Sequence, residues 1–171
     1  FGCYDVFKKF YIYLSKENEK TFLIYRPGFI EFLRNMKSIY EIILFASGDE
    51  NYVDPIINEI EKDENFFDYV LYKKNMTKDS YGNCVKDIGL LGRDLKDILI
   101  VDHFAQYLQM NKKNSICIKP FFGDLIKQKN TLKILGNVLA KIRFDVEESK
   151  DITKSLKKYG NLLYPEISLR F

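Results

Sequence analysis

The stretch from Arg26 to Ala46, RPGFIEFLRNMKSIYEIILFA, decides the fold. Pro27 and Gly28 end an extended run, and apolar residues then recur at helical spacing as far as Ser38, with the proline placed to open the helix. Directly afterwards, Glu41–Ala46 (EIILFA) is a continuous apolar run of the kind expected from a strand that is buried on both faces. A helix followed at once by such a strand predicts an α/β protein with a parallel sheet.

Alternating helices and strands continue toward the C-terminus, where apolar residues recur at helical spacing in some segments and form short continuous runs in others. The predicted elements are a helix from Val53 to Ile60 with Pro55 near its start, a strand at Phe67–Tyr72 (FDYVLY), a turn at Tyr81–Asn83, strands at Ile98–Val101 (ILIV) and Ser115–Ile118, a long helix from Leu125 to Ile142 and a last helix over Asp151–Lys158. Since no linker or repeat divides them, we expect a single domain over residues 1–171.

Two short runs rich in β-forming residues precede this pattern. Phe10–Leu14 (FYIYL) and Thr21–Tyr25 (TFLIY) are separated by the polar residues SKENEK, which predicts a β-hairpin. We expect this hairpin to be an addition to a mostly parallel sheet.

The composition predicts a soluble globular domain. Of the 171 residues, 46% are hydrophobic and 15% aromatic, which excludes intrinsic disorder, and 30% are charged, which excludes an integral membrane protein. No apolar stretch is long enough to form a transmembrane segment. Lys plus Arg number 27 and Asp plus Glu number 24, so the net charge of +3 gives no reason to expect direct binding of nucleic acid.

Charge is unevenly spread along the chain. From Asp49 to Asp79 there are nine acidic and four basic residues, whereas from Asp124 to Gly160 there are nine basic and five acidic ones. Such a pattern is typical of two differently solvated faces, and it also allows a basic docking surface for an acidic partner. The sequence leaves both interpretations open.

The three cysteines, Cys3, Cys84 and Cys117, are odd in number and lack the spacing of a metal site. We expect them to be reduced and structural. This predicts a reducing intracellular compartment, either the cytosol, the nucleus or the matrix side of the mitochondrion.

Ligands of a parallel α/β sheet bind outside the carboxyl ends of its strands, so the residues that follow the apolar runs are the candidates for a site. These are Ala46–Gly48, Lys86–Asp87 and Asp102–His103. A carboxylate at the end of a buried strand, as predicted for Asp102, costs several kcal/mol to desolvate unless a cation or hydrogen-bond donors meet it. Three interpretations are open. Lys86 is the cation that meets Asp102, or Lys86 and Asp102 together hold a phosphate and a metal. In the third, Asp102 caps the following helical turn by accepting hydrogen bonds from backbone N–H groups.

His103 is the only histidine in the chain, which excludes a multi-histidine metal site and a pair of histidine catalysts. No Ser or Cys near it stands in a recognisable nucleophile motif. The sequence also lacks GxxxxGK[ST] and GxGxxG after a strand, so it gives no indication of nucleotide binding of the common kinds.

Six segments follow one another in an order that resembles a known family. They are Arg26–Leu33 (RPGFIEFL), Tyr40–Ser47 (YEIILFAS), Tyr52–Pro55 (YVDP), Gly82–Ile88 (GNCVKDI), Leu91–Leu95 (LGRDL) and Ile98–Asp102 (ILIVD). The series resembles the catalytic domain of the small C-terminal-domain phosphatases, the NLI-interacting-factor-like or FCP/SCP homology domain of the haloacid dehalogenase superfamily. The resemblance covers nearly the whole chain.

The resemblance implies a Rossmann-like haloacid-dehalogenase sheet and Mg²⁺-dependent phosphoryl transfer to an aspartate. By position, Lys86 matches the phosphate-binding lysine and Asp102 matches the first metal-associated acid. Two positions depart from the family pattern. Ala46 stands where a phosphate-binding Thr is expected, with Ser47 beside it as a substitute, and His103 stands where Asn or Asp is expected. Imidazole is a poor ligand for a hard cation that requires oxygen, so Asp102 and His103 would bind a metal only in a complete site.

The family's DxDx(T/V) motif, which supplies the nucleophilic Asp and the general acid, does not occur in the sequence. By the resemblance it should lie just before Phe1, on a first strand that is central in the sheet. We therefore expect the domain to be N-terminally incomplete, with this first strand missing from the chain. Because a soluble domain does not tolerate two unpaired buried edges, we expect a gap beside EIILF and ILIV that an upstream segment or a strand from another chain fills.

Two functions are compatible with this pattern. The first is a degenerate, non-catalytic phosphatase-like domain that binds other protein subunits, similar to the presequence-receptor subgroup of the mitochondrial inner-membrane translocase; no cofactor is then expected, and the mitochondrion is preferred over the nucleus or cytoplasm. The second is an active Mg²⁺-dependent Ser/Thr protein phosphatase, forming an aspartyl-phosphate on a motif upstream of Phe1. The absent motif, Ala46 and His103 favour the first. A bare α/β domain with no preserved site is the third interpretation, if Lys86 and Asp102 lie far apart.

Overall fold

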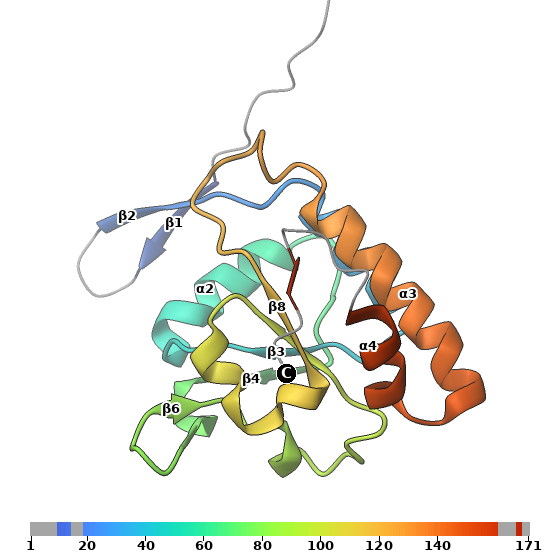
Figure 1. Cartoon of the computed structure of the whole chain (residues 1–171). Helices are drawn as coiled ribbons and strands as arrows, with labels where there is room; N and C mark the ends of the chain where they lie inside the picture. The colour runs from blue at the N-terminus through green and yellow to red at the C-terminus, as the bar shows by residue number, and fades with distance from the viewer. Residues whose placement is uncertain (1–9, 15–18, 161–166, 169–171) are drawn as a thin grey trace, which may run out of the picture.

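The computed structural model describes residues 10–14, 19–160 and 167–168 of the chain (Figure 1). In chain order the elements are β1 (Phe10–Leu14), β2 (Glu19–Leu23), α1 (Phe29–Lys37), β3 (Ile43–Phe45), α2 (Glu50–Ile60), β4 (Tyr69–Leu71), the 3₁₀ helix η1 (Lys73–Asn75), β5 (Thr77–Lys78), β6 (Cys84–Val85), the 3₁₀ helix η2 (Ile88–Leu90), β7 (Ile100–Asp102), the 3₁₀ segment η3 (Ala105–Asn114), β8 (Ser115–Ile118), α3 (Thr131–Ser149), α4 (Ile152–Gly160) and β9 (Ile167–Ser168).

Parallel strand pairs form the centre of the fold. β3 pairs with β4 in parallel, and the register places Ile43 opposite Tyr69 and Phe45 opposite Leu71. β7 pairs with β8 in parallel, and β9 adds an antiparallel edge to β8. β1 and β2 form an antiparallel hairpin, and within the described residues they pair only with each other. The prediction of a mixed α/β fold with parallel strands and an added hairpin is confirmed.

Most predicted elements lie close to where the apolar pattern places them, although several bounds differ; β3 and β4 are shorter than predicted, and α2 begins three residues earlier. β2 begins and ends two residues earlier than predicted. β7 begins two residues later, because the Ile98 carbonyl ahead of it accepts a hydrogen bond from Asn114 Nδ2 (2.8 Å). The long helix α3 begins at Thr131, so Leu125 lies outside it. The antiparallel strand β9 had no counterpart among the predicted elements.

Long-range hydrogen bonds hold the segment before α3 in turns instead of a helix. Arg26 donates from Nη1 to Gln128 Oε1 (2.6 Å) and from Nη2 to the Lys119 carbonyl (2.7 Å). Within the segment, Asp124 Oδ1 accepts a hydrogen bond from the Lys127 N–H (2.9 Å). These contacts leave no periodic trace in the sequence, which is why apolar spacing alone placed the helix start too early.

The main core lies where α1, α3, α4 and β8 meet. Gly28 leads into α1 in a left-handed conformation (φ 77°), which glycine adopts without steric cost. α1 then buries Leu33 and Met36, and Met36 packs against the buried residues of α3. The buried residues of this core are Met36, Ile116, Leu132, Leu135, Leu139, Ile142, Ile152 and Leu156.

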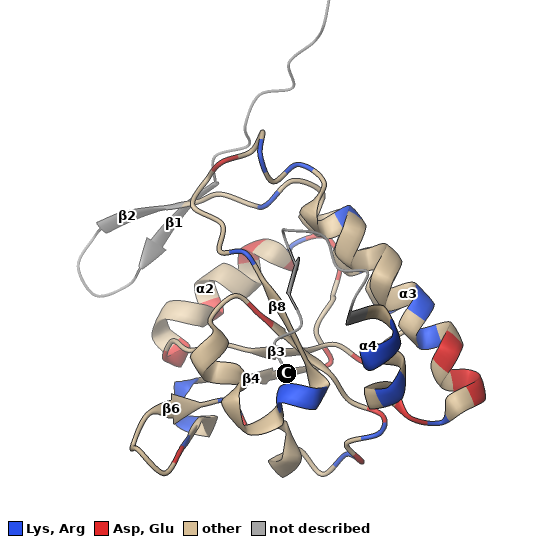
Figure 2. Cartoon of the chain, in the orientation of Figure 1, with Lys and Arg blue, Asp and Glu red and all other residues tan. Residues whose placement is uncertain are grey.

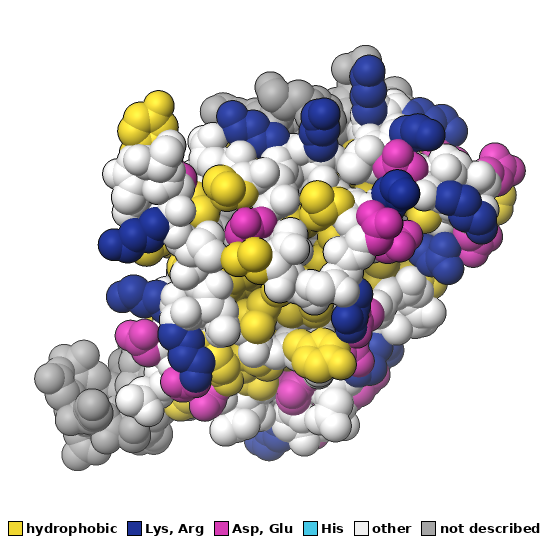
Figure 3. All heavy atoms as spheres, turned by 90° about the horizontal axis from the view of Figure 1, so that it is seen from below, with side chains coloured by type: hydrophobic (Ala, Val, Ile, Leu, Met, Phe, Trp, Pro, Cys, Tyr) yellow, Lys and Arg dark blue, Asp and Glu magenta, His cyan; other side chains and the backbone are white. Residues whose placement is uncertain are grey.

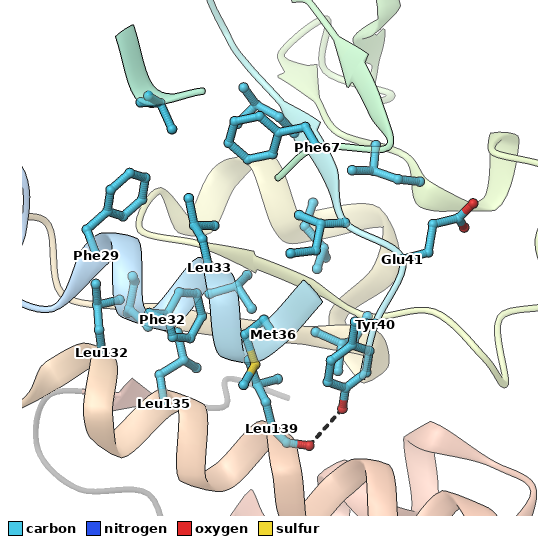
Figure 4. A pocket seen from close by; sticks show the side chains of 18 of the residues that line it. Phe29, Phe32, Leu33, Met36, Tyr40, Glu41, Phe67, Leu132, Leu135 and Leu139 are labelled. Atoms are coloured by element: carbon cyan, nitrogen blue, oxygen red, sulfur yellow. Dashed lines mark hydrogen bonds between the residues drawn. The ribbon is translucent and has the colours of Figure 1, made fainter. Parts of the chain in front are cut away.

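β3 and β7 face each other across an apolar cavity of about 700 Å³, which we call the slot (Figure 4). Within the described part of the chain, no strand pairs with the edge of β3 opposite β4, or with the edge of β7 opposite β8. The slot is lined by Leu23–Arg26, by Phe29, Phe32, Leu33 and Met36 of α1, by Tyr40–Leu44, by Ile60 and Phe67, by Ile88, Leu91 and Arg93, by Asp97–Val101 and Ile118, and by Leu132, Leu135 and Leu139 of α3.

The slot explains why β3 is less buried than its sequence predicts. All three residues of β3 are only partly buried, whereas the continuous apolar run predicts a strand covered on both faces. That prediction is wrong for the residues that the structure describes. The expected gap beside EIILF and ILIV, in contrast, is present.

Charged residues are unevenly distributed over the helices (Figure 2). Acidic residues lie along α2, whereas α4 carries basic ones and α3 carries both, the acidic ones toward its C-terminal end. The uneven charge of the sequence thus falls on different helices. In the described ranges, no helix combines the length and the apolar character that crossing a membrane requires.

We expect Leu156→Ala to lower the free energy of unfolding by about 2–5 kcal/mol, because it leaves a cavity in a core where this side chain is 0% exposed. Leu90→Ala makes the same chemical change on a side chain that is 67% exposed and should change stability by less than about 0.5 kcal/mol. Urea unfolding followed by circular dichroism measures both. Equal effects of the two substitutions would show that the core is wrongly placed.

Tyr40 makes the stability of the fold sensitive to alkaline pH. Its hydroxyl donates to the Leu139 carbonyl of α3 (2.7 Å), and burial raises its pKa from the ordinary value of 10.0 to about 12, although nearby Arg143 opposes the shift. Because the folded-state pKa is raised, the stability that the neutral hydroxyl contributes is complete below pH 10 and is lost as the pH rises through 12. Tyr40→Phe should therefore flatten the decline of the free energy of unfolding between pH 10 and 12.

Urea unfolding at several pH values in this range measures how steeply the free energy of unfolding declines with pH. The matched control is Tyr52→Phe, which changes an exposed tyrosine of α2. If Tyr40→Phe leaves the slope as steep as in the wild type and the control, the buried hydroxyl does not lie where the structure places it.

Candidate functional site

A buried ion pair lies at the carboxyl end of the strands. Lys86 follows β6 and Asp102 ends β7. Lys86 Nζ donates to Asp102 Oδ2 at 2.5 Å, and the two side chains are only 8% and 7% exposed. The sequence placed both residues at the candidate site, and the structure brings them into contact. A domain in which the two lie far apart is therefore excluded.

Backbone hydrogen bonds position both members of the pair. Asp102 Oδ1 accepts from the Phe104 N–H (2.9 Å), while the Lys86 N–H donates to the Tyr107 carbonyl (2.9 Å). The cation and the backbone donor that the sequence offered as alternatives for Asp102 are thus both present, one on each carboxylate oxygen. Each buried charge has a partner, as buried charges require.

Two aromatic rings cover the Lys86 ammonium. Its Nζ lies 5.0 Å from the centroid of the Tyr107 ring and 5.6 Å from that of Phe45, which ends β3. Phe104 packs edge-on against Tyr107, with centroids 4.8 Å apart. Sequence reasoning missed this cover. Phe45 could have been found from its place at the end of an apolar run, but nothing in the spacing of Tyr107 indicates that it lies over Lys86.

The remaining predicted site residues are exposed. His103 is 58% exposed at its side chain, and its Nδ1 lies 3.4 Å from Asp102 Oδ1. Ser47 is exposed in the loop after β3, and Ala46 beside it is held by a hydrogen bond from its N–H to the Leu71 carbonyl (2.7 Å). The structure therefore brings Lys86, Asp102 and His103 together, and it places Ser47 in the loop that follows Phe45.

Asp87 has a structural role next to the pair. Its Oδ1 accepts hydrogen bonds from the Gly89 N–H and from Asn111 Nδ2, both at 2.9 Å, which caps η2 and ties it to η3. Ser115 Oγ in turn donates to the Asn111 carbonyl (2.6 Å). This network fixes the two segments that carry Lys86 and Tyr107.

The described residues do not by themselves fit a magnesium ion. Mg²⁺ requires several oxygen ligands in near-octahedral geometry, and no group of three or more His, Cys, Asp or Glu side chains that could hold a metal occurs in the described part of the chain. Asp102 is the one carboxylate of the pair, and the Lys86 ammonium at 2.5 Å would repel a cation there. As described, the arrangement is an almost neutral, desolvated ion pair.

Comparison with known proteins gives a consistent family match. The family model described as NLI interacting factor-like phosphatase matches residues 3–153. The chain is 33% identical over 115 residues to the CTD small phosphatase-like protein 2 of Dictyostelium discoideum, covering 67% of this chain and 20% of that protein. It is 32% identical over 106 residues to Phosphatase Herzog of Drosophila melanogaster, covering 62% and 30% of the respective chains.

A relative that is named as a translocase subunit, and not as a phosphatase, is aligned with a longer stretch of this chain. The mitochondrial import inner membrane translocase subunit TIM50 of Candida glabrata is 30% identical over 137 residues, covering 80% of this chain and 27% of that protein. The chain therefore spans only about a fifth to a third of the length of these curated relatives.

We expect Lys86→Met to lower the free energy of unfolding by about 3–5 kcal/mol, because it leaves the Asp102 carboxylate buried without its cation. The double variant Lys86→Met/Asp102→Asn should cost less than the sum of its two single variants, since it removes both charges and keeps an oxygen for the Phe104 N–H. Urea unfolding of the three variants gives the coupling energy.

The control is Lys127→Met, the same substitution in an exposed pair with Asp124, where the lysine side chain is 85% exposed. It should leave stability unchanged within error. An equal effect of Lys86→Met and Lys127→Met would contradict a desolvated pair, and so would additive costs in the double variant.

Proposed function

The chain belongs to the NLI interacting factor-like phosphatase family, and from that membership we propose that it is a phosphatase-like domain that binds other protein subunits and does not itself hydrolyse phosphate esters. The state of the Lys86–Asp102 pair carries this proposal. In this site the lysine ammonium is neutralised by a carboxylate at 2.5 Å and is covered by the rings of Tyr107 and Phe45. A lysine so occupied is poorly placed to receive the oxygens of a phosphate group.

Two neighbouring positions support the same proposal. Ala46 offers no hydroxyl where the family resemblance leads us to expect a phosphate-binding one. His103 offers an imidazole nitrogen to the hard cation that phosphoryl transfer would use, and such a cation prefers oxygen ligands. Under this proposal the domain needs no cofactor.

Binding of other subunits is supported by a relative and by the surface. The TIM50 relative is by its name a subunit of a mitochondrial import translocase. Viewed from below, one face of the molecule gathers hydrophobic side chains near its centre with charged side chains around them (Figure 3), which is typical of surfaces that bind proteins. We propose other protein subunits as the partners and the mitochondrion as the location, with the nucleus or cytoplasm as the alternative.

An active Mg²⁺-dependent Ser/Thr protein phosphatase is the second candidate. It is supported by the identity of Lys86 and Asp102, the two positions that match the family's phosphate lysine and metal-associated acid. It is also supported by relatives that are named phosphatases. In that case a DxDxT motif would lie upstream of Phe1, and the domain would use Mg²⁺ together with an aspartate outside the described residues.

Hydrolysis of p-nitrophenyl phosphate by the full-length protein separates the two candidates. We expect the rate with Mg²⁺ to equal the rate with EDTA, and the Lys86→Ala variant to show the same rate as the wild type. Lys127→Ala, which alters an exposed lysine, is the matched control. Native mass spectrometry of the tagged protein purified from its own source should also show a complex of fixed stoichiometry.

Mg²⁺-dependent turnover that Lys86→Ala abolishes and Lys127→Ala preserves would overturn the proposal, provided that circular dichroism shows both variants folded. The second candidate would then stand.

A further inference from the structure

We propose that the surface formed by η3 and α4 is a docking site for an acidic segment of a partner protein. Its five lysines, which we call the lysine face, are Lys112 and Lys113 of η3 and Lys154, Lys157 and Lys158 of α4. None of them belongs to the candidate functional site. The docking site therefore goes beyond the proposed function, and it holds whether or not the domain hydrolyses phosphate esters.

Packing of the opposite sides of η3 and α4 turns these lysines outward. α4 packs Ile152 and Leu156 into the main core. Its three lysines are spaced three and four residues apart and are all exposed, so they share the outer side of the helix. In η3, Asn111 and Asn114 are buried, whereas the two lysines between them are exposed.

The segment before β7 joins the two elements. Asn114, the last residue of η3, donates from Nδ2 to the carbonyls of Leu95 (2.5 Å) and Ile98 (2.8 Å). The Ile152 N–H, at the start of α4, donates to the Lys96 carbonyl between them (2.7 Å). η3 and α4 also pack directly against each other, and Figure 2 shows their basic segments side by side. Lysines that are far apart in the sequence therefore lie on one surface.

The positive charge of the lysine face is only partly neutralised. Both lysines of η3 and Lys157 form no ion pair within the described ranges. Lys158 pairs with Asp145 (2.8 Å), and Lys154 lies 4.0 Å from Asp151. Like charges four residues apart on a helix, as on Lys154 and Lys158, repel each other. A partner that supplies carboxylates would relieve this repulsion.

Exposed arginines elsewhere on the surface are matched within the chain. Arg34 pairs with Glu64 (2.9 Å), and Arg93 pairs with Glu41 (2.9 Å). The lysine face thus differs from these parts of the surface, because most of its cations have no carboxylate of their own chain. This is the charge pattern that a surface complementary to an acidic partner requires.

The chemistry of the lysine face favours carboxylates over nucleic acid or lipid. All five side chains are lysines, and none is an arginine, whose planar guanidinium binds phosphate in a bidentate manner. α4 packs its apolar residues into the core, so it has no apolar side to enter a membrane as interfacial helices do. Carboxylates at alternate positions of an extended segment are about 7 Å apart, which is close to the roughly 5–6 Å between lysines three or four residues apart on a helix. An extended, acidic polypeptide segment therefore fits the face.

Fluorescence anisotropy with a labelled peptide of alternating Glu and Ser tests the docking site on the full-length protein. The peptide should bind, and a counterpart with Gln in place of Glu should not. The affinity should fall between about 0.1 M and about 1 M NaCl, because the Debye length shortens from about 10 Å to about 3 Å. The variant Lys112→Gln/Lys154→Gln/Lys157→Gln should weaken binding at least roughly tenfold.

The matched control is Lys62→Gln/Lys78→Gln/Lys127→Gln, which removes the same charge from exposed lysines elsewhere and should leave the affinity nearly unchanged. Circular dichroism verifies that both variants are folded, as expected for substitutions of exposed side chains. An equal loss of affinity in the two variants, or no binding of the peptide by the wild type, would overturn the proposal. Tighter binding of an oligonucleotide, or of vesicles of phosphatidylcholine and phosphatidylserine, that requires the lysine face would also overturn it.

Chemical acetylation of the wild-type protein locates the bound peptide without any variant. The peptide should slow the reaction of the lysine face with N-hydroxysuccinimide acetate, read by mass spectrometry, and should leave the reaction of Lys62, Lys78 and Lys127 unchanged. Equal protection of all these lysines would contradict a specific docking site. Neither measurement depends on phosphatase activity, so the docking site and the proposed function can fail separately.

Discussion

The pairing of backbone hydrogen-bonding groups along β3 and β7 is the constraint on which the rest of the structure depends. Each strand has one edge paired in parallel, β3 with β4 and β7 with β8, and one edge that faces the slot. The apolar side chains of α1 and α3 cover the slot, so water cannot readily satisfy the free backbone groups there. A central strand would satisfy both edges at once and would complete the covering of β3 that its apolar sequence indicates.

The same arrangement explains the place and the character of the site. Lys86 and Asp102 lie where the carboxyl ends of β3 and β7 converge, beside the end of the slot. Because both side chains are nearly buried, the ion pair is held by fixed partners: the Phe104 N–H on the carboxylate and the rings of Phe45 and Tyr107 over the ammonium.

Sequence patterns predicted the parts of the fold that local periodicity determines. Apolar spacing located α1, α2 and α4, and continuous apolar runs located β3, β4, β7 and β8. The cost of burying the Asp102 carboxylate predicted that a cation or a donor would meet it, and the structure has both. Contacts between distant segments could not be predicted in this way: the turns that Arg26 holds before α3, the cover of Lys86 by Tyr107, and β9 on the edge of β8.

The determination of an experimental structure of the full-length protein tests the central claim most directly. The account predicts one continuous sheet in which a further parallel strand lies between β3 and β7 and pairs with Ile43 and Phe45. A structure in which β3 and β7 pair directly with each other, or in which loops or side chains of the described residues fill the slot, would contradict it.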